Sequence, residues 1–192
     1  MVDDAALARI LSTDIAELTF SEIFDGLPTE DSFREFNARM PGNPVFQLEH
    51  TSLCPGVTER LLSAFQRSHL GTREFELRLI ELLAVACHQI AVYLYILDEG
   101  NHKHRLYEEW RETPDAREFP GQYVVPTPFY HSSYIFDQQY PNGVADIVGY
   151  WAEANIFGGV VLFDRGESGT ECRDLFLHPA RFKGPRTIFP LF

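Results

Sequence analysis

The chain has 192 residues, 45% of them hydrophobic and 14% aromatic, which suits one domain with a sizeable core and excludes a disordered protein. Its formal net charge of -12 repels phosphate backbones and anionic lipids, so generic nucleic-acid and membrane-surface binders are disfavoured. Any RNA contact would need a local basic patch. We expect a single domain over residues 1–192, with residues 1–44 as a peripheral helical segment and residues 45–192 as the core.

The cysteines and the N-terminal residues bear on the cellular compartment. The chain has three cysteines: Cys54, Cys87 and Cys172. An odd number without a CxxC pair argues against a disulfide framework and against a zinc site. The N-terminal residues are acidic and hold no long apolar run, so they do not resemble a secretory signal. We therefore expect a cytoplasmic, reducing compartment.

Helices are predicted first along the chain. Residues 3–24 read as two short helices, the second capped by Thr13-Asp14, and residues 29–39 as a third. These helices are expected to be peripheral and to pack over the core or over the mouth of a pocket. Residues 45–54 are predicted to be extended, and residues 57–68 to form a helix with an apolar inner face.

The longest predicted helix begins after Thr72, as its N-cap, and ends at about Leu97. It is apolar over most of its circumference, and its polar residues indicate a buried helix, not a membrane span, so no membrane partner is expected. Four polar residues recur every seven positions, nearly two turns, and so form one stripe: Glu74, Glu81, His88 and Tyr95. The stripe has two interpretations, an edge that reaches solvent or the lining of a cavity.

The middle of the chain is less regular. Residues 98–114 form a polar break in which His102 and His104 could bind a metal, but no third ligand is nearby. Residues 131–140 show little periodicity, residues 141–143 (PNG) predict a turn, and residues 144–154 predict a short helix.

The C-terminal part reads as a strand over residues 156–163, with Gly158-Gly159 inside, a polar turn, and a second strand over residues 173–177. A last short strand is predicted at residues 187–191. Strands joined by short turns are antiparallel. The predicted fold class is therefore α+β: N-terminal helices and one long buried helix packed on a small, mostly antiparallel C-terminal sheet.

The polar turn, residues 164–172 (DRGESGTEC), concentrates groups that transfer protons, pair charges or attack carbon. A solvated hairpin tip is also polar and glycine-rich, and that interpretation stays open. If the turn lies near Glu81 and His88, a site exists there. Glu167 and Glu171 would then bind a cationic group or move protons, and Arg165 would hold a substrate carboxylate or position Glu167.

Residues 88–91 (HQIA) and, more strongly, residues 140–172 (YPNGVADIVGYWAEANIFGGVVLFDRGESGTEC) resemble an uncharacterised family of small proteins from filamentous fungi. The resemblance covers most of the chain from about residue 45 onward. More loosely, the chain is similar to fungal arginine-containing cyclodipeptide synthases, which make cyclo-Arg-Xaa dipeptides from aminoacyl-tRNAs in specialised metabolism. This similarity implies aminoacyl transfer and peptide-bond formation, with aminoacyl-tRNA as the partner.

The residue types fit such chemistry. Arginine is recognised by carboxylates through paired hydrogen bonds, and the nucleophile and base of an acyl transfer are typically a hydroxyl or thiol with a histidine. The predicted catalytic residues are His88, Glu167, Ser168, Glu171 and Cys172. The predicted substrate-binding residues are Glu81, His131, Tyr134, Glu153, Asp164 and Arg165. A local basic strip could contact tRNA, although it could equally be ordinary surface charge: Arg173, Arg181, Lys183 and Arg186.

Two other functions stay open. A cofactor-independent isomerase, cyclase or hydrolase would use an aromatic-rich pocket with a few acids and a histidine to act on a small molecule. A non-enzymatic interaction module would be favoured if Tyr107, Trp110 and Phe129 were exposed. The sequence has no GxGxxG, P-loop or HExxH motif, so we predict neither a nucleotide cofactor nor a metal. The oligomeric state is left open.

Overall fold

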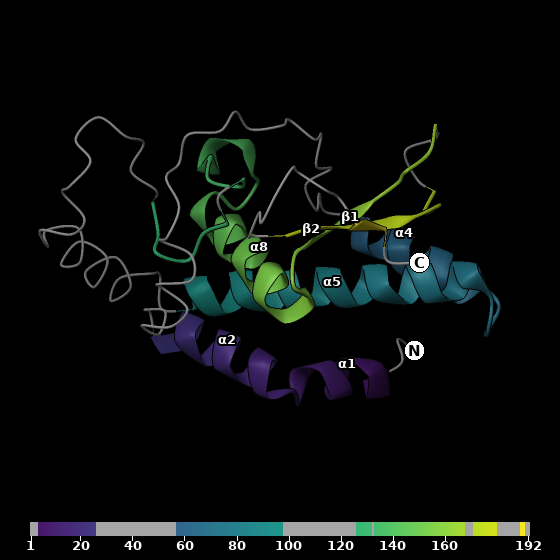
Figure 1. The fold of residues 1–192 in the computed structure, drawn as a ribbon, viewed down its shortest axis with the longest axis horizontal. Helices are drawn as coiled ribbons and strands as arrows, with labels where there is room; N and C mark the ends of the chain where they lie inside the picture. Colours follow the sequence, from purple (N-terminus) through teal and green to yellow (C-terminus); the bar gives the residue numbers. More distant parts are fainter. Residues whose placement is uncertain are drawn as a thin grey trace, which may run out of the picture.

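The computed structural model describes residues 4–25, 57–97, 126–131, 133–167, 171–179 and 189–190. Its helices are α1 (Asp4–Leu11), α2 (Asp14–Asp25), α4 (Val57–Arg67), α5 (Arg73–Ile96), the 3-10 helix η1 (Asp137–Gln139) and α8 (Val144–Phe157). Its strands are β1 (Val160–Phe163), β2 (Leu175–His178) and β3 (Phe189–Pro190). The predicted α+β class is confirmed (Figure 1).

The long helix α5 is the element against which the others pack. Thr72 is its N-cap, as predicted, and accepts the backbone N–H of Phe75 at 3.2 Å. Helices α8, α4 and α2 pack on α5, and β1 contacts it as well. In the view of Figure 1, α1 and α2 run below α5 and the sheet lies above it, while α8 contacts both α5 and α2.

The main core cluster forms where α2, α5 and α8 meet. Thr13 begins α2 by accepting the backbone N–H of Ala16, and Ala16, Thr19 and Ile23 then recur on one buried face. Ile23 packs with Trp151 of α8 in this cluster. Helix α2 is therefore a core element, and the prediction that residues 1–44 are peripheral does not hold for it.

The polar stripe of α5 faces the interior. Glu81, His88 and Tyr95 are buried, and Glu74 is exposed. The solvent-edge interpretation therefore fails for three of the four positions. Burying a carboxylate and an imidazole is costly without partners, so each needs charged neighbours from other elements.

The boundary between α8 and β1 differs from the predicted one. Helix α8 continues to Phe157, three residues beyond the predicted end, and Gly158 terminates it in the left-handed conformation at φ 78°. Gly159 then passes so close to β2 that a Cβ would lie 2.8 Å from the carbonyl oxygen of His178. The prediction of one strand over residues 156–163 with both glycines inside it was wrong, because this apolar run suits a helix end as well as a strand.

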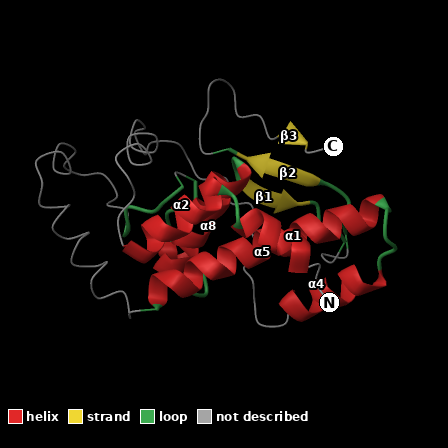
Figure 2. Cartoon of the chain, turned by 90° about the horizontal axis from the view of Figure 1, so that it is seen from below, coloured by secondary structure: helices red, strands yellow, loops and turns green. Residues whose placement is uncertain are grey.

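The sheet has the order β1-β2-β3 and is antiparallel throughout. Val160 is the register partner of His178, and Phe163 that of Leu175. Figure 2 shows the strands on one side of the helical layer. Leu175 and Val161 pack against Leu77 of α5, so the predicted packing of the sheet on the long helix is confirmed.

Several predicted features lie outside the described residues: the helix at 29–39, the extended segment at 45–54, and the polar break with His102 and His104. In the part of the chain that the structure describes, α5 is long and apolar enough to cross a membrane by length and composition, with 56% of its most apolar window buried inside the protein. Core helices of soluble proteins meet the same criteria.

Candidate functional site

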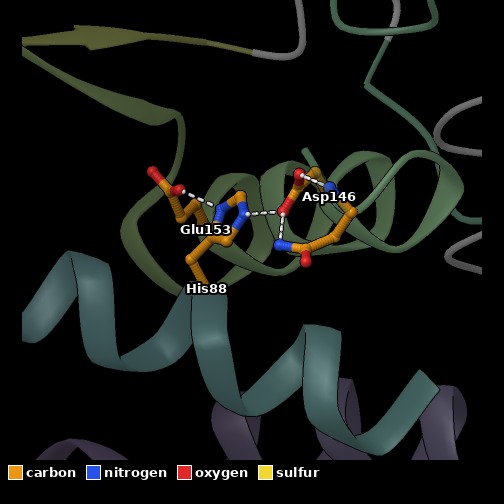
Figure 3. Close-up of polar contacts among 4 residues, drawn as sticks. His88, Asp146 and Glu153 are labelled. Atoms are coloured by element: carbon orange, nitrogen blue, oxygen red, sulfur yellow. Dashed lines mark hydrogen bonds and ion pairs between the residues drawn. The ribbon is translucent and has the colours of Figure 1, made fainter. Parts of the chain in front are cut away.

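The interior holds a histidine between two carboxylates. His88 lies on α5, and Asp146 and Glu153 lie on α8, nearly two turns apart. The Nδ1 atom of His88 is 2.7 Å from Oε1 of Glu153, and its Nε2 atom is 3.2 Å from Oδ1 of Asp146 (Figure 3). An imidazolium that donates from both nitrogens satisfies this arrangement.

The two carboxylates have further donors. Oε2 of Glu153 accepts the backbone N–H of Val161 on β1 at 3.1 Å. Asp146 accepts the backbone N–H of Asn142 at 2.8 Å and its side-chain amide at 2.9 Å. These bonds offset part of the cost of burying two negative charges with one positive charge.

Gly149 makes room for the imidazole of His88. It lies between Asp146 and Glu153 along α8, and a Cβ at this position would be 2.5 Å from Cε1 and Nε2 of the ring. Helices α5 and α8 can pack this closely only because residue 149 has no side chain. Tyr150 covers another side of the ring edge-on, with the ring centroids 4.7 Å apart.

The contacts within the cluster shift the pKa values of His88 and Asp146. Burial by itself lowers the pKa of His88, but the hydrogen bonds and charges of Asp146 and Glu153 outweigh it and raise that pKa to about 9. Burial by itself raises the pKa of Asp146, but the bonds from His88 and Asn142 bring it below its usual value. His88 is 2% exposed, and both its nitrogens are engaged. This geometry favours a structural role over the general-base role predicted for His88, and Glu153 serves the same cluster.

A second buried ion cluster surrounds Glu81, about 10 Å from His88 along α5 at 1.5 Å per residue. Glu81 is fully buried and accepts from Arg78 at 2.8 Å and from Arg165 on the turn after β1. The guanidinium of Arg165 also lies over the ring of Phe163 at 4.8 Å. Arg165 therefore holds Glu81 instead of positioning Glu167, and Glu81 is engaged by two arginines.

The polar turn does not join His88. Asp164 and Glu167 are exposed, and Glu171 pairs with the exposed Arg173. His88 is held by Asp146 and Glu153 instead, so the predicted site that combines Glu167 and Glu171 with His88 is not formed.

Cys172 is poorly suited to the predicted nucleophilic role. It is buried beside the Glu81 cluster. Burial and the charge of Glu81 raise the pKa of its thiol to about 11. The thiol is therefore protonated at neutral pH, and a protonated, buried thiol is unreactive.

A third cluster lies at the end of β2. His178 has Nδ1 3.0 Å from the hydroxyl oxygen of Tyr134 and Nε2 3.5 Å from Oγ of Ser133. His131 stands beside it, with ring centroids 5.2 Å apart, and accepts the backbone N–H of Ser133 on its Nδ1 at 3.2 Å. Ser133 and His178 are partly exposed, while Tyr134 and His131 are buried. Ser133 and His178 thus retain some exposed surface, and the two buried residues pack beside them.

The chemistry of this cluster depends on where the proton of His178 sits. Burial raises the pKa of Tyr134, and the charge of Glu153 raises it further, so the phenol is neutral. In the tautomer with the proton on Nδ1, His178 donates to the Tyr134 oxygen and its Nε2 can accept the proton of the Ser133 hydroxyl. The cluster then contains a nucleophile, a base and a group that orients the base.

His131 and Tyr134 were predicted from the sequence as substrate-binding residues, whereas Ser133 and His178 were not predicted. The available signal was the HSSY sequence together with a histidine at the end of the second predicted strand. His178 pairs with Val160 at the start of β1. At this end of the strand pair its imidazole contacts the Ser133 hydroxyl.

The remaining predicted site residues, Ser168, Arg181, Lys183 and Arg186, lie outside the described residues. Across the described ranges, no group of three or more His, Cys, Asp or Glu side chains could hold a metal ion. Comparison of the chain with protein-family models, with curated proteins and with solved structures gives no match.

Proposed function

We propose that this protein is an acyl-transfer enzyme in which Ser133 attacks an activated acyl group and His178 accepts the proton. The observation that carries the proposal is the approach of Ser133 Oγ to His178 Nε2 at 3.5 Å, with Nδ1 of the same ring held by Tyr134 at 3.0 Å. Contacts between a nucleophile and its base are often long without substrate and shorten in the complex.

The reaction starts on an ester. The Ser133 oxygen forms a bond to the acyl carbon while its proton moves to Nε2 of His178. The bond from the acyl carbon to the leaving alcohol then breaks, and that alcohol takes the proton from Nε2. An amine then attacks the same carbon of the acyl-serine and gives a proton to Nε2. The bond from the acyl carbon to the Ser133 oxygen breaks, and that oxygen takes the proton back from Nε2.

We propose that the ester is an aminoacyl-tRNA and that the amine belongs to a second aminoacyl-tRNA, so that the first transfer gives a dipeptidyl-tRNA. The free amine of this dipeptide then attacks its own ester carbon, the tRNA hydroxyl leaves with the proton, and the product is a cyclo-Arg-Xaa dipeptide. This part of the proposal follows the loose resemblance, inferred from the sequence, to arginine-containing cyclodipeptide synthases, whose substrates are esters of this kind. A tRNA contact would use the predicted basic strip, because a chain with a net charge of -12 needs local cationic groups to approach RNA. Of this strip, Arg173 pairs with Glu171, and Arg181, Lys183 and Arg186 lie outside the described residues.

Product analysis tests this proposal. The purified protein is incubated with tRNA, arginyl-tRNA synthetase, a mixture of amino acids with their synthetases, and ATP, and products are identified by mass spectrometry. We expect a cyclo-Arg-Xaa mass that RNase abolishes, that Ser133→Ala abolishes, and that replacing Arg181, Lys183 and Arg186 by Glu strongly reduces. If charged tRNA is verified and a folded protein forms no such product, the synthase proposal is overturned.

A small-molecule hydrolase is the second candidate. The same Ser133 and His178 would act on an ester with water as the acceptor, and the acidic surface would then need no RNA partner. Turnover of soluble esters that RNase does not affect, together with no cyclo-Arg-Xaa product, would favour it.

The interaction-module alternative loses one of its three aromatic residues, because Phe129 is fully buried against Trp151.

A further inference from the structure

Two series of contacts connect the buried His88 to His178, the base of the proposed reaction. The first is aromatic. The ring of His88 meets Tyr150 edge-on at 4.7 Å, and Tyr150 stacks on Tyr134 at 4.6 Å. The Tyr134 hydroxyl then contacts Nδ1 of His178 at 3.0 Å. Tyr134 and Tyr150 are both buried, so neither ring can turn without moving its neighbour.

The second series runs through the backbone. Glu153 binds His88 through one oxygen and the N–H of Val161 through the other, which ties the start of β1 to α8. Val160 is the register partner of His178. The aromatic series thus reaches the imidazole of His178, and the backbone series reaches its main chain.

The other buried ion cluster, around Glu81, contacts the opposite end of the strand pair. Glu81 is tied to Arg165, beyond the far end of β1, where Phe163 pairs with Leu175. The His88 cluster and the Glu81 cluster, which both involve α5, thus contact opposite ends of the β1–β2 pair. Only one of them adjoins the end that carries His178.

We propose that His88, held between Asp146 and Glu153, is a positioning residue for His178. It fixes Tyr150 and Glu153, and through them it holds the His178 imidazole with Nδ1 toward Tyr134 and Nε2 toward Ser133. The inference rests on the proposed function in taking Ser133 and His178 as the reacting pair. His88 itself touches no substrate.

The direct readout is the tautomer of His178, which needs no substrate. In protein with 15N-labelled histidine, the Nδ1 and Nε2 chemical shifts identify the protonated nitrogen, and the spectrum of His178→Gln assigns the signals. We expect the wild type to carry the proton on Nδ1. We expect His88→Gln and Tyr150→Leu to give a mixture of tautomers.

A second readout is the rate at which an alkyl fluorophosphonate labels Ser133. His88→Gln and Tyr150→Leu should lower this labelling rate at least about tenfold, because small displacements of a reacting group slow the reaction strongly. Tyr150→Phe keeps the ring and should retain both the tautomer and the rate, which keeps the test valid if His88→Gln fails to fold. Leu82→Ala, a core truncation elsewhere on α5, controls for lost stability and should leave the tautomer unchanged.

The outcomes separate the two proposals. If Tyr150→Leu leaves the His178 tautomer as in the wild type, or if Leu82→Ala disturbs it equally, the positioning role is overturned. If the tautomer responds as expected but wild-type Ser133 is not labelled, positioning is supported and the acyl-transfer function fails.

Discussion

The imidazole of His88 on α5 occupies the space that a side chain would take at Gly149 on α8. A Cβ at residue 149 would lie 2.5 Å from Cε1 and Nε2 of that ring. The same ring bridges Asp146 and Glu153, three residues before and four residues after the glycine. Asp146, Gly149 and Glu153 therefore form one face of α8, on which the glycine leaves room for the His88 ring and the two acids bind it.

Gly149→Ala should destabilise the protein. In a helix interior, replacing glycine by alanine ordinarily stabilises by about 0.5–1 kcal/mol. Here the added methyl group clashes with His88, and overpacking of this kind costs about 1–3 kcal/mol. Urea unfolding of the variant and the wild type measures the difference in the free energy of unfolding.

A double-mutant cycle isolates the clash. In the His88→Ala background the ring is gone, so Gly149→Ala should become neutral or stabilising. An equal loss of stability in both backgrounds would show that the contact between residues 88 and 149 is not the cause.

The stability of the protein should fall in alkaline solution. The pKa of His88 rises from 6.5 in the unfolded chain to about 9 in the fold, so its contribution is fully present below 6.5 and is lost as the pH rises through about 9. A shift of this size corresponds to about 3 kcal/mol. Burial also raises the pKa values of Cys87 and Tyr150, so their ionisation in the unfolded chain from about pH 9 upward adds a further loss of stability, which the wild type and a His88 variant share.

Urea unfolding at about pH 6 and about pH 9 measures this dependence. The His88→Gln variant is the control, because it keeps hydrogen-bonding capacity but does not titrate. The wild type should lose more stability than the variant between the two pH values. Parallel losses would mean that His88 is not the titrating group.

Cys87 and Cys172 should resist thiol reagents in the folded protein. Cys87 is fully buried, and burial with the charge of Glu153 raises its pKa to about 12. The pKa of Cys172 is about 11. A Cys54→Ser variant treated with a thiol-reactive chromogen at about pH 8 should release no colour until denaturant is added. Rapid reaction of either thiol without denaturant would contradict the packing described here.

The fold could be predicted where local sequence decides it. The N-cap of α5 and the antiparallel pairing of the strands on either side of the polar turn follow from local patterns, and both were confirmed. The end of α8 was misplaced because an apolar run at residues 156–163 suits either a helix end or a strand, and only the left-handed Gly158 distinguishes them.

The site could not be predicted in the same way. His88 is 58 residues from Asp146 and 65 from Glu153, so their meeting depends on how α5 and α8 pack. A signal existed, however: two acids seven residues apart on an apolar helix, with a glycine between them, match the seven-residue stripe of the long helix. Likewise, Ser133 and His178 meet through tertiary structure, 45 residues apart.

Covalent labelling of Ser133 tests the central claim most directly. The folded protein is treated with an alkyl fluorophosphonate at about pH 7, and the modified residue is located by peptide mass spectrometry. We predict a single adduct on Ser133, absent in Ser133→Ala and strongly reduced in His178→Ala. A folded protein that remains unlabelled, or a Ser133 adduct that forms equally fast without His178, would contradict the proposed acyl-transfer site.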